Sequence, residues 1–289
     1  MIPPFDYKKP RTLQEAYNLL WEYGGKVRVI AGGTDLVILL RSGKEHPHCL
    51  VDITEISELR RIEEKDGMIF IGAAVTHSEI SSSPLVRRCG KVLSDAAGEI
   101  GSPQIRNIGT IGGNIVNASP AADTLPALMV LNAVGKVGSR EGEREVALQQ
   151  LIKGPYESGL RSHEILVGIA FQKLSSDTKT TFVRLARREA MAIARMSVAL
   201  LLQMDKGKNR IRDIRVSLGA VTPTPQRVSG VEALLKGKSR DEDTLKIASR
   251  KVSEEMVQQA GVRPSTSYKS PVVEALFLRA LRNALESET

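Results

Sequence analysis

Two glycine clusters carry the clearest chemical signal in the sequence. The first reads Ala31-Gly32-Gly33-Thr34-Asp35, and the second reads Gly109-Thr110-Ile111-Gly112-Gly113-Asn114. Neither has the Gly-Lys-Ser/Thr ending of a P-loop or the G-x-G-x-x-G spacing of a dinucleotide-binding turn. Glycine lets the backbone approach a ligand closely and permits positive φ angles, so consecutive N–H groups can converge on an anion. Two such loops suit a diphosphate, whereas an ordinary turn is the alternative for either loop alone.

Two aspartates accompany these loops. Ser119 is placed to cap a helix with Pro120 at its first position, which puts Asp123 in the first turn. A carboxylate there either stabilises the helix dipole or accepts hydrogen bonds from the ribose or adenine of a nucleotide. Asp35 would repel a nearby phosphate, so we expect it to cap the next helix with its charge turned away.

The loops lie among alternating helices and strands. Thr12, with Glu15 three residues later, is expected to cap a first helix, and a strand over 27–31 enters the first loop before a short helix over 36–40. A strand that runs through glycines into a helix is a phosphate-binding geometry. Further along the chain, the pattern predicts strands at 68–74, 134–137, 165–171 and 211–221, and helices at 77–81 (capped by Thr76), 85–100, 231–235, 243–259 and 271–285.

Composition excludes several classes of protein. The 289 residues are 42% hydrophobic and 26% charged, which is ordinary for a globular chain. No apolar stretch reaches the roughly 18 to 20 residues of a membrane helix, and the first ten residues lack the apolar core of a secretory signal, so we expect a cytoplasmic protein. The net charge of +8 suits nucleic acid, an anionic cofactor or an acidic partner. Because only 4% of residues are aromatic, a base-stacking surface is not expected.

The cysteines predict no metal centre on this chain. Cys49 and Cys89 are isolated, without a C-x-x-C pair, so a four-cysteine zinc or iron–sulfur site is not expected. His46 and His48 flank Cys49, but Pro47 restricts the backbone and no fourth ligand is near, so a surface turn is the interpretation we favour.

Several stretches together resemble the FAD-binding subunit of the molybdenum hydroxylases. They are AGGTDL, IGAAVTHSEI and GSPQIRNIGTIGGNIVNASPAADTLPAL, with RREAMAIA and SLGAVTPTPQR downstream. The family includes the medium subunit of carbon monoxide dehydrogenase and the flavin subunit of xanthine dehydrogenase. The resemblance spans nearly the whole chain and implies an α+β fold. Residues 1–56 and 57–176 would form a two-part FAD-binding unit of the vanillyl-alcohol oxidase type, and 177–289 a small α+β domain with an antiparallel sheet and helices.

The resemblance also implies which residues contact FAD. Asp123 matches a nucleotide-binding aspartate, Leu166 a residue that packs on the cofactor, and Ile100 a position that lines the flavin pocket. Ile193 matches a side chain that covers the isoalloxazine, although a buried leucine-rich helix is the alternative for this run. Arg184 falls close to a position usually held by a lysine; arginine keeps the charge but is larger and forked. The full set predicted to bind the cofactor is Ile30, Ala31, Gly32, Gly33, Thr34, Asp35, Leu36, Ile100, Gly109, Thr110, Ile111, Gly112, Gly113, Asn114, Asp123, Leu166, Arg184 and Ile193.

By the same resemblance, the chain is an electron-transfer subunit. A large subunit would carry the molybdenum cofactor, a small subunit the [2Fe-2S] centres, and this chain FAD, which would pass electrons to NAD, a quinone or oxygen. A dimer of heterotrimers is the expected assembly, and no catalytic acid, base or nucleophile is required here. Two alternatives remain: a free-standing flavoprotein oxidase, for which His77 would be the only histidine near a motif, and a basic nucleotide-sensing or nucleic-acid-binding protein.

Overall fold

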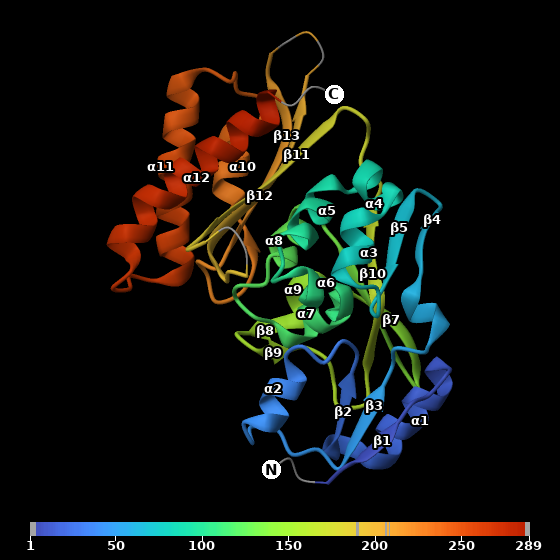
Figure 1. Ribbon diagram of the computed structural model, residues 1–289. Coiled ribbons are helices and arrows are strands. Elements are labelled where there is room, and N and C mark those ends of the chain that lie inside the picture. Colours follow the sequence, from blue (N-terminus) through green and yellow to red (C-terminus); the bar gives the residue numbers. More distant parts are fainter. Residues whose placement is uncertain (1–3, 189–190, 206, 208, 287–289) are drawn as a thin grey trace.

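The computed structural model describes residues 4–188, 191–205, 207 and 209–286. Three parts follow one another along the chain (Figure 1): an N-terminal part at the bottom of the view, a middle part at the centre right and a C-terminal part at the upper left. Each part has its own sheet and its own buried cluster. The mixed helix and strand architecture confirms the α+β prediction.

The N-terminal part is a small parallel sheet with the order β1-β3-β2. Thr12 caps α1 by accepting a hydrogen bond from the backbone N–H of Glu15 at 3.2 Å, as predicted. The helix then buries Ala16, Tyr17 and Leu20 against the sheet. The elements are β1 (Asp6–Lys8), α1 (Leu13–Tyr23), η1 (Gly24–Lys26), β2 (Val27–Ile30), α2 (Leu36–Arg41), β3 (Cys49–Asp52) and η2 (Ser57–Arg60).

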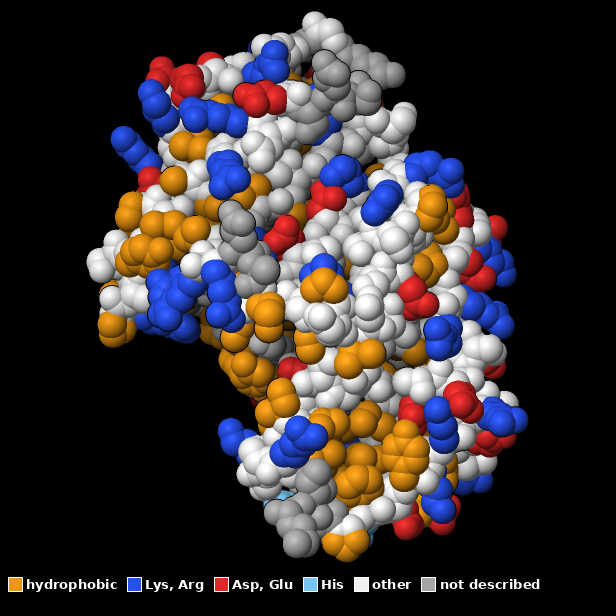
Figure 2. Space-filling view, in the orientation of Figure 1, with side chains coloured by type: hydrophobic (Ala, Val, Ile, Leu, Met, Phe, Trp, Pro, Cys, Tyr) orange, Lys and Arg blue, Asp and Glu red, His pale blue; other side chains and the backbone are white. Residues whose placement is uncertain are grey.

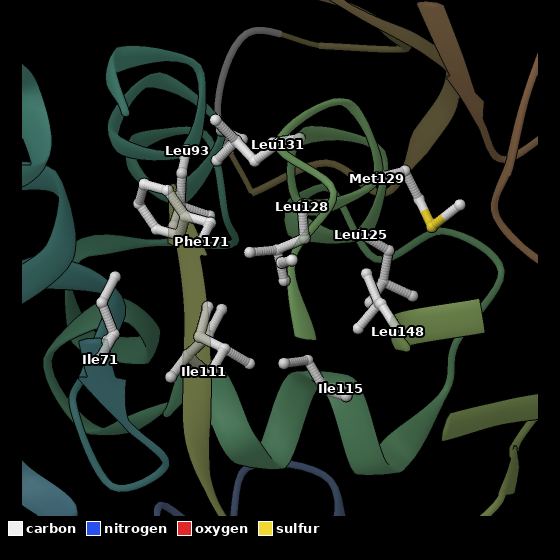
Figure 3. Close-up of a cluster of buried hydrophobic side chains, with 14 of the residues drawn as sticks. Ile71, Leu93, Ile111, Ile115, Leu125, Leu128, Met129, Leu131, Leu148 and Phe171 are labelled. Carbon is white, nitrogen blue, oxygen red and sulfur yellow. The ribbon is translucent and has the colours of Figure 1, made fainter. Parts of the chain in front are cut away.

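The middle part is an antiparallel sheet with the order β4-β5-β10-β6-β7, covered by helices. Neighbouring residues of β5 face opposite ways, so Ile71 joins the helices while Phe70 packs on the N-terminal cluster. In β10 a bulge between Leu166 and Gly168 changes the face, so Val167 joins the N-terminal cluster although Phe171 joins the helices. Figure 3 shows Ile111 and Ile115 of α7 pointing into the same core as Leu128. The elements are β4 (Ile62–Lys65), β5 (Met68–Gly72), α3 (His77–Ser82), α4 (Pro84–Cys89), α5 (Lys91–Gly98), α6 (Pro103–Ile108), α7 (Ile111–Asn117), α8 (Thr124–Val130), β6 (Val134–Ser139), β7 (Gly142–Ala147), α9 (Leu148–Leu151), β8 (Ile152–Gly154), β9 (Glu157–Ser158) and β10 (Ile165–Gln172).

The single helix predicted over 85–100 is wrong. The segment forms two helices, α4 and α5, which meet at Gly90. A Cβ on Gly90 would lie 2.7 Å from the ring of Phe171, so only glycine lets the chain turn this close to β10. Cys89, just before the turn, is fully buried in the same core. The segment is helical as its apolar pattern predicts, but the break between the two helices depends on an aromatic ring far along the chain.

The C-terminal part is a second antiparallel sheet, β11-β12-β13-β14, with helices packed on one face. Residues Val198 and Leu200 of β12 face those helices, whereas Ala199 and Leu201 pack into the core of the middle part. Because both faces of β12 are covered, its sequence is continuously apolar. The elements are β11 (Thr178–Ala186), β12 (Ala194–Met204), β13 (Ile211–Gly219), β14 (Gln226–Arg227), α10 (Ser229–Leu235), α11 (Glu242–Ala260) and α12 (Thr266–Glu286). The alternative of a leucine-rich helix after Ile193 is therefore wrong.

We predict that Gly90→Ala destabilises the fold through its contact with Phe171. The added methyl group would overlap the ring, at a cost of about 1–3 kcal/mol in the free energy of unfolding. In a Phe171→Leu background the same change should cost less, with a coupling of at least about 0.5 kcal/mol. Urea unfolding of the two single variants and the double variant measures this coupling, and strictly additive losses would show that the ring does not set the turn.

Candidate functional site

The two glycine loops, far apart in the sequence, pack directly against each other. A Cβ on Gly32 would lie 1.9 Å from the carbonyl oxygen of Ile108, just before the second loop. A Cβ on Gly109 would in turn lie 3.7 Å from the hydroxyl of Thr34. Two chain segments approach this closely only where no side chain separates their backbones. The loops therefore form one continuous surface at the junction of the N-terminal and middle parts.

The first loop presents a run of unoccupied donors. Within the described chain, the backbone N–H groups of Gly32, Gly33, Thr34, Asp35 and Leu36 donate to no protein acceptor. Gly33 has a φ of +68°, a left-handed conformation that favours glycine and turns the chain into α2. Successive N–H groups around such a turn form an anion-binding concavity. The first loop thus has the donors that a phosphate requires.

Three backbone N–H groups of the second loop donate to acceptors within the protein. The N–H groups of Ile111 and Gly112 donate to the carbonyl oxygens of Val75 and Ala73, at 3.0 and 2.9 Å, and that of Gly113 donates to the hydroxyl of Thr110 at 3.1 Å. A Cβ on Gly112 would lie 2.6 Å from the backbone oxygen of Ala73. These three amides are occupied, whereas the N–H of Thr110 has no acceptor among the described residues, so converging amides in the second loop stay a prediction. Its glycines allow α7 to pack against the end of β5.

Asparagine side chains link α7 to its neighbours. Asn117 donates from Nδ2 to Oδ1 of Asp35 at 3.1 Å, and Asn114 accepts through Oδ1 from the hydroxyl of Thr124 at 2.5 Å. Asp35 precedes α2, but its carboxylate caps no N–H of that helix. The expectation that Asp35 would act as a cap is therefore corrected, because its charge is turned toward Asn117 and ties the first loop to α7.

Asp123 is a buried carboxylate with one free oxygen. The helix expected to start at Pro120 begins at Thr124, so Ser119 caps only a turn and Asp123 itself is the capping residue, without a side-chain bond to the helix. Its side chain is 6% exposed; Oδ2 accepts from Nη1 of Arg184 at 3.3 Å, and Oδ1 has no partner among the described residues. Burial raises the pKa of Asp123 to about 7, and Arg184 limits that rise. The free oxygen is available to a ligand.

Arg184 is committed to protein partners. Its guanidinium pairs with Glu99 at 2.8 Å and with Asp123, and it also donates to the carbonyl oxygen of Ala192 at 3.2 Å. Arg184 therefore joins α5, the start of α8 and the segment just before Ile193. We expect it to influence a bound cofactor through Asp123 rather than by direct contact with the flavin ring.

Apolar side chains at and near the predicted site differ in exposure. Ile193 is 80% exposed and Ile108 is 52% exposed, while Ile100 is half-buried. Figure 2 shows the surface hollowed between the N-terminal and C-terminal parts, with hydrophobic side chains along the hollow. Leu166 lies elsewhere, inside the core, where a Cβ on Gly135 would be 3.1 Å from its Cδ1. The predicted cofactor contacts of Leu166, Ile100 and Ile193 stay predictions.

His77 lies against the second loop, although it was not among the residues predicted to bind the cofactor. It is 2% exposed, its backbone N–H donates to the carbonyl oxygen of Gly109 at 3.0 Å, and its Nδ1 has no partner among the described residues. Burial, reinforced by the charge of Arg106, lowers the pKa of His77 to about 4. The imidazole of His77 is therefore neutral and packs against the second loop at Gly109. The capping motif Thr76-His77-Ser78-Glu79 was the available signal, because it fixes His77 at the start of α3.

Comparison with known proteins identifies the family. Residues 3–171 match the family model described as the FAD binding domain in molybdopterin dehydrogenase. The chain belongs to this flavoprotein family. Residues 181–284 also match the CO dehydrogenase flavoprotein C-terminal domain.

Similar proteins match over nearly their whole length. The glyceraldehyde dehydrogenase medium chain of Sulfolobus acidocaldarius is 34% identical, covering 98% of this chain and 99% of its own. The nicotinate dehydrogenase FAD-subunit of Eubacterium barkeri is 30% identical, with 98% and 96% covered. A solved carbon monoxide dehydrogenase from Hydrogenophaga pseudoflava superposes with a TM-score of 0.91 at 29% identity, covering 99% of each chain. This chain is therefore an oxidoreductase subunit, the FAD-binding medium subunit of a molybdenum hydroxylase-type complex.

The geometry fits FAD as the cofactor of this flavoprotein. The unoccupied N–H groups of the first loop suit its diphosphate, and the free Oδ1 of Asp123 suits a hydroxyl or amine of its nucleotide part. Within the described residues, no group of three or more His, Cys, Asp or Glu side chains is arranged to hold a metal ion. No described helix is long and apolar enough to cross a membrane.

We predict that Gly32→Ala separates the two loops. Its methyl group would collide with the carbonyl of Ile108, so the variant should lose about 1–3 kcal/mol of stability and retain little FAD after purification. The matched control is Gly25→Ala, where an added Cβ meets nothing within 4 Å. Thermal melting and the flavin absorbance of the purified proteins test this; a Gly32→Ala protein with wild-type melting and flavin content would contradict the loop contact.

We also predict that His77 makes the fold sensitive to acid. Between the unfolded pKa near 6.5 and the folded pKa of about 4, the unfolded chain binds the additional proton, so stability falls as the pH drops through this range. His77→Gln should remove up to about 3 kcal/mol of that fall. Urea unfolding at pH 7 and pH 4.5 gives the difference, with the exposed His48→Gln as control; equal acid sensitivity in His77→Gln and wild type would refute the assignment.

Proposed function

We propose that FAD on this chain relays electrons between partner subunits and a final acceptor. Electrons would leave a molybdenum centre in a large subunit, pass through [2Fe-2S] centres in a small subunit, and reach the flavin bound here. The flavin would then discharge to NAD or another acceptor, and the complex would be a dimer of heterotrimers. The observation that carries the proposal is the run of unoccupied N–H groups in the first loop, packed against the second.

Relatives support an assembled complex. They are named as a FAD-subunit, a medium chain and a FAD-binding subunit, which are names for parts of larger enzymes. The chain matches such relatives over almost their entire length, so we expect it to contribute the same flavin-binding subunit to a complex. We also propose that the complex acts in the cytoplasm.

The residues of this chain would bind and shield the cofactor. The first loop would hold the diphosphate through N–H groups from Gly32 to Leu36, and Asp123, oriented by Arg184, would accept a hydrogen bond through its free oxygen. Exposed Ile193 would cover an apolar ring and exclude water. Bound FAD supplies the two-electron chemistry. The proposal assigns this chain no proton transfer, because binding and insulation suffice for an electron relay.

A free-standing flavoprotein oxidase is the competing function. Such an enzyme would bind its own organic substrate at the flavin and need no other chain. It would therefore be reduced by substrate when purified alone. The relay requires partners, so the two functions differ in a measurable way.

We predict that a complex captured through a tag on this chain contains iron, molybdenum and flavin, and has the mass of two copies of each of three chains. Substrate of the molybdenum subunit should bleach the flavin absorbance in the complex but not in the isolated FAD-loaded chain. A complex carrying Gly32→Ala should still bleach its iron–sulfur absorbance while passing few electrons onward. Flavin reduction by substrate in the isolated chain would overturn the relay in favour of the oxidase.

A further inference from the structure

A cluster of three cations, one of them two residues from Ile193, has no counter-charge among the described residues. Arg195 stands at the start of β12, Arg263 in the turn between α11 and α12, and Lys269 in the first turns of α12. None of the three forms an ion pair with a carboxylate of the described residues. Figure 2 shows Lys and Arg side chains gathered at the edge of the hollow, where Figure 1 places the turn between α11 and α12.

The cluster is electrostatically unfavourable in the free chain. The ammonium of Lys269 is half-buried and held by the carbonyl oxygen of Ala220 at 2.9 Å. Burial lowers the pKa of Lys269, and the charges of Arg263 and Arg195 lower it further. A cation near the beginning of a helix also opposes the helix dipole. Three positive charges held close together create a positive electrostatic potential. A bound anion would reduce their mutual repulsion.

An aromatic ring next to the cluster indicates which kind of anion it would bind. Tyr268 is 47% exposed, and the guanidinium of Arg195 lies 5.9 Å from the centre of its ring. An exposed aromatic ring beside cations provides a stacking surface for a base together with charge for phosphates. Arg195 follows Ile193 by two residues, so the cluster borders the segment that we expect to cover the flavin.

We propose that Arg195, Arg263 and Lys269 bind the diphosphate of a dinucleotide electron acceptor, with Tyr268 contacting its adenine. This inference rests on the proposed function, which requires an acceptor to reach the flavin. The three cations come from three separate segments. Backbone carbonyls hold two of them, since Lys269 donates to Ala220 and Arg263 Nε donates to Ala260 at 3.0 Å, which preorganises these two for a doubly charged group. An NAD-type acceptor has that diphosphate, whereas oxygen and quinones do not.

The test measures binding of ADP-ribose, which has the diphosphate and adenine but no redox-active ring, to the full-length FAD-loaded chain. Calorimetry should show binding that weakens as salt increases. The double variant Arg263→Gln/Lys269→Gln should bind about tenfold or more weakly, since two charge-assisted contacts are lost. The matched control is Arg279→Gln, an exposed arginine of α12 with no ion pair among the described residues, which should bind as wild type.

Flavin absorbance, recorded on the same samples, separates this inference from the proposed function. A wild-type chain that retains no FAD would count against the relay itself. A chain that retains FAD but binds ADP-ribose no better than the double variant does would overturn only the acceptor site. If the double variant keeps ADP-ribose affinity and instead fails to assemble with partner chains, the cluster is a protein interface and the proposal is wrong.

Discussion

The contact between two glycine-containing backbones holds the whole site together. Gly32 meets the carbonyl of Ile108 at a distance that excludes any side chain, and this contact joins the N-terminal part to the middle part. The first loop can turn its N–H groups outward because Gly33 adopts a left-handed conformation, and because Asn117 and α7 hold its other side. Backbone N–H groups keep their positions for a ligand only if the residues packed against the loop hold it in place. Here that packing is the buried face of α7, whose Ile111 and Ile115 reach the central core (Figure 3).

The division of work between the loops follows from where their donors point. The first loop leaves its N–H groups free, so it can bind an anion. In the second loop, the N–H groups of Ile111, Gly112 and Gly113 donate to Val75, Ala73 and Thr110, so these residues mainly fix α7 against the middle part. Similar glycine-rich sequences thus serve two different physical purposes. The distinction is invisible along the chain because the acceptors that occupy the second loop come from the segment that follows β5.

Local features of the fold were predictable, and features set by distant contacts were not. The caps at Thr12 and Thr76 involve residues three positions apart, so the sequence alone identified them. The break at Gly90 depends on Phe171, and the strand β12 lost its alternating pattern because both of its faces are buried. The same limit applies to the site: the loop motifs were recognised, but the partners of Asp35 and Arg184 come from other elements and required the structure.

Burial explains why the ionisable groups of the site differ from one another. Asp123 and His77 are both enclosed by protein, and each keeps one polar atom without a partner among the described residues. An unpaired buried polar atom reduces stability, so such atoms persist where a ligand completes them or where a neutral group fills space. His77 meets the second condition, since its low pKa keeps it uncharged beneath the second loop. For Asp123, Arg184 compensates one oxygen and the other is free for the nucleotide contact that we propose, which would link cofactor binding to the stability of this region.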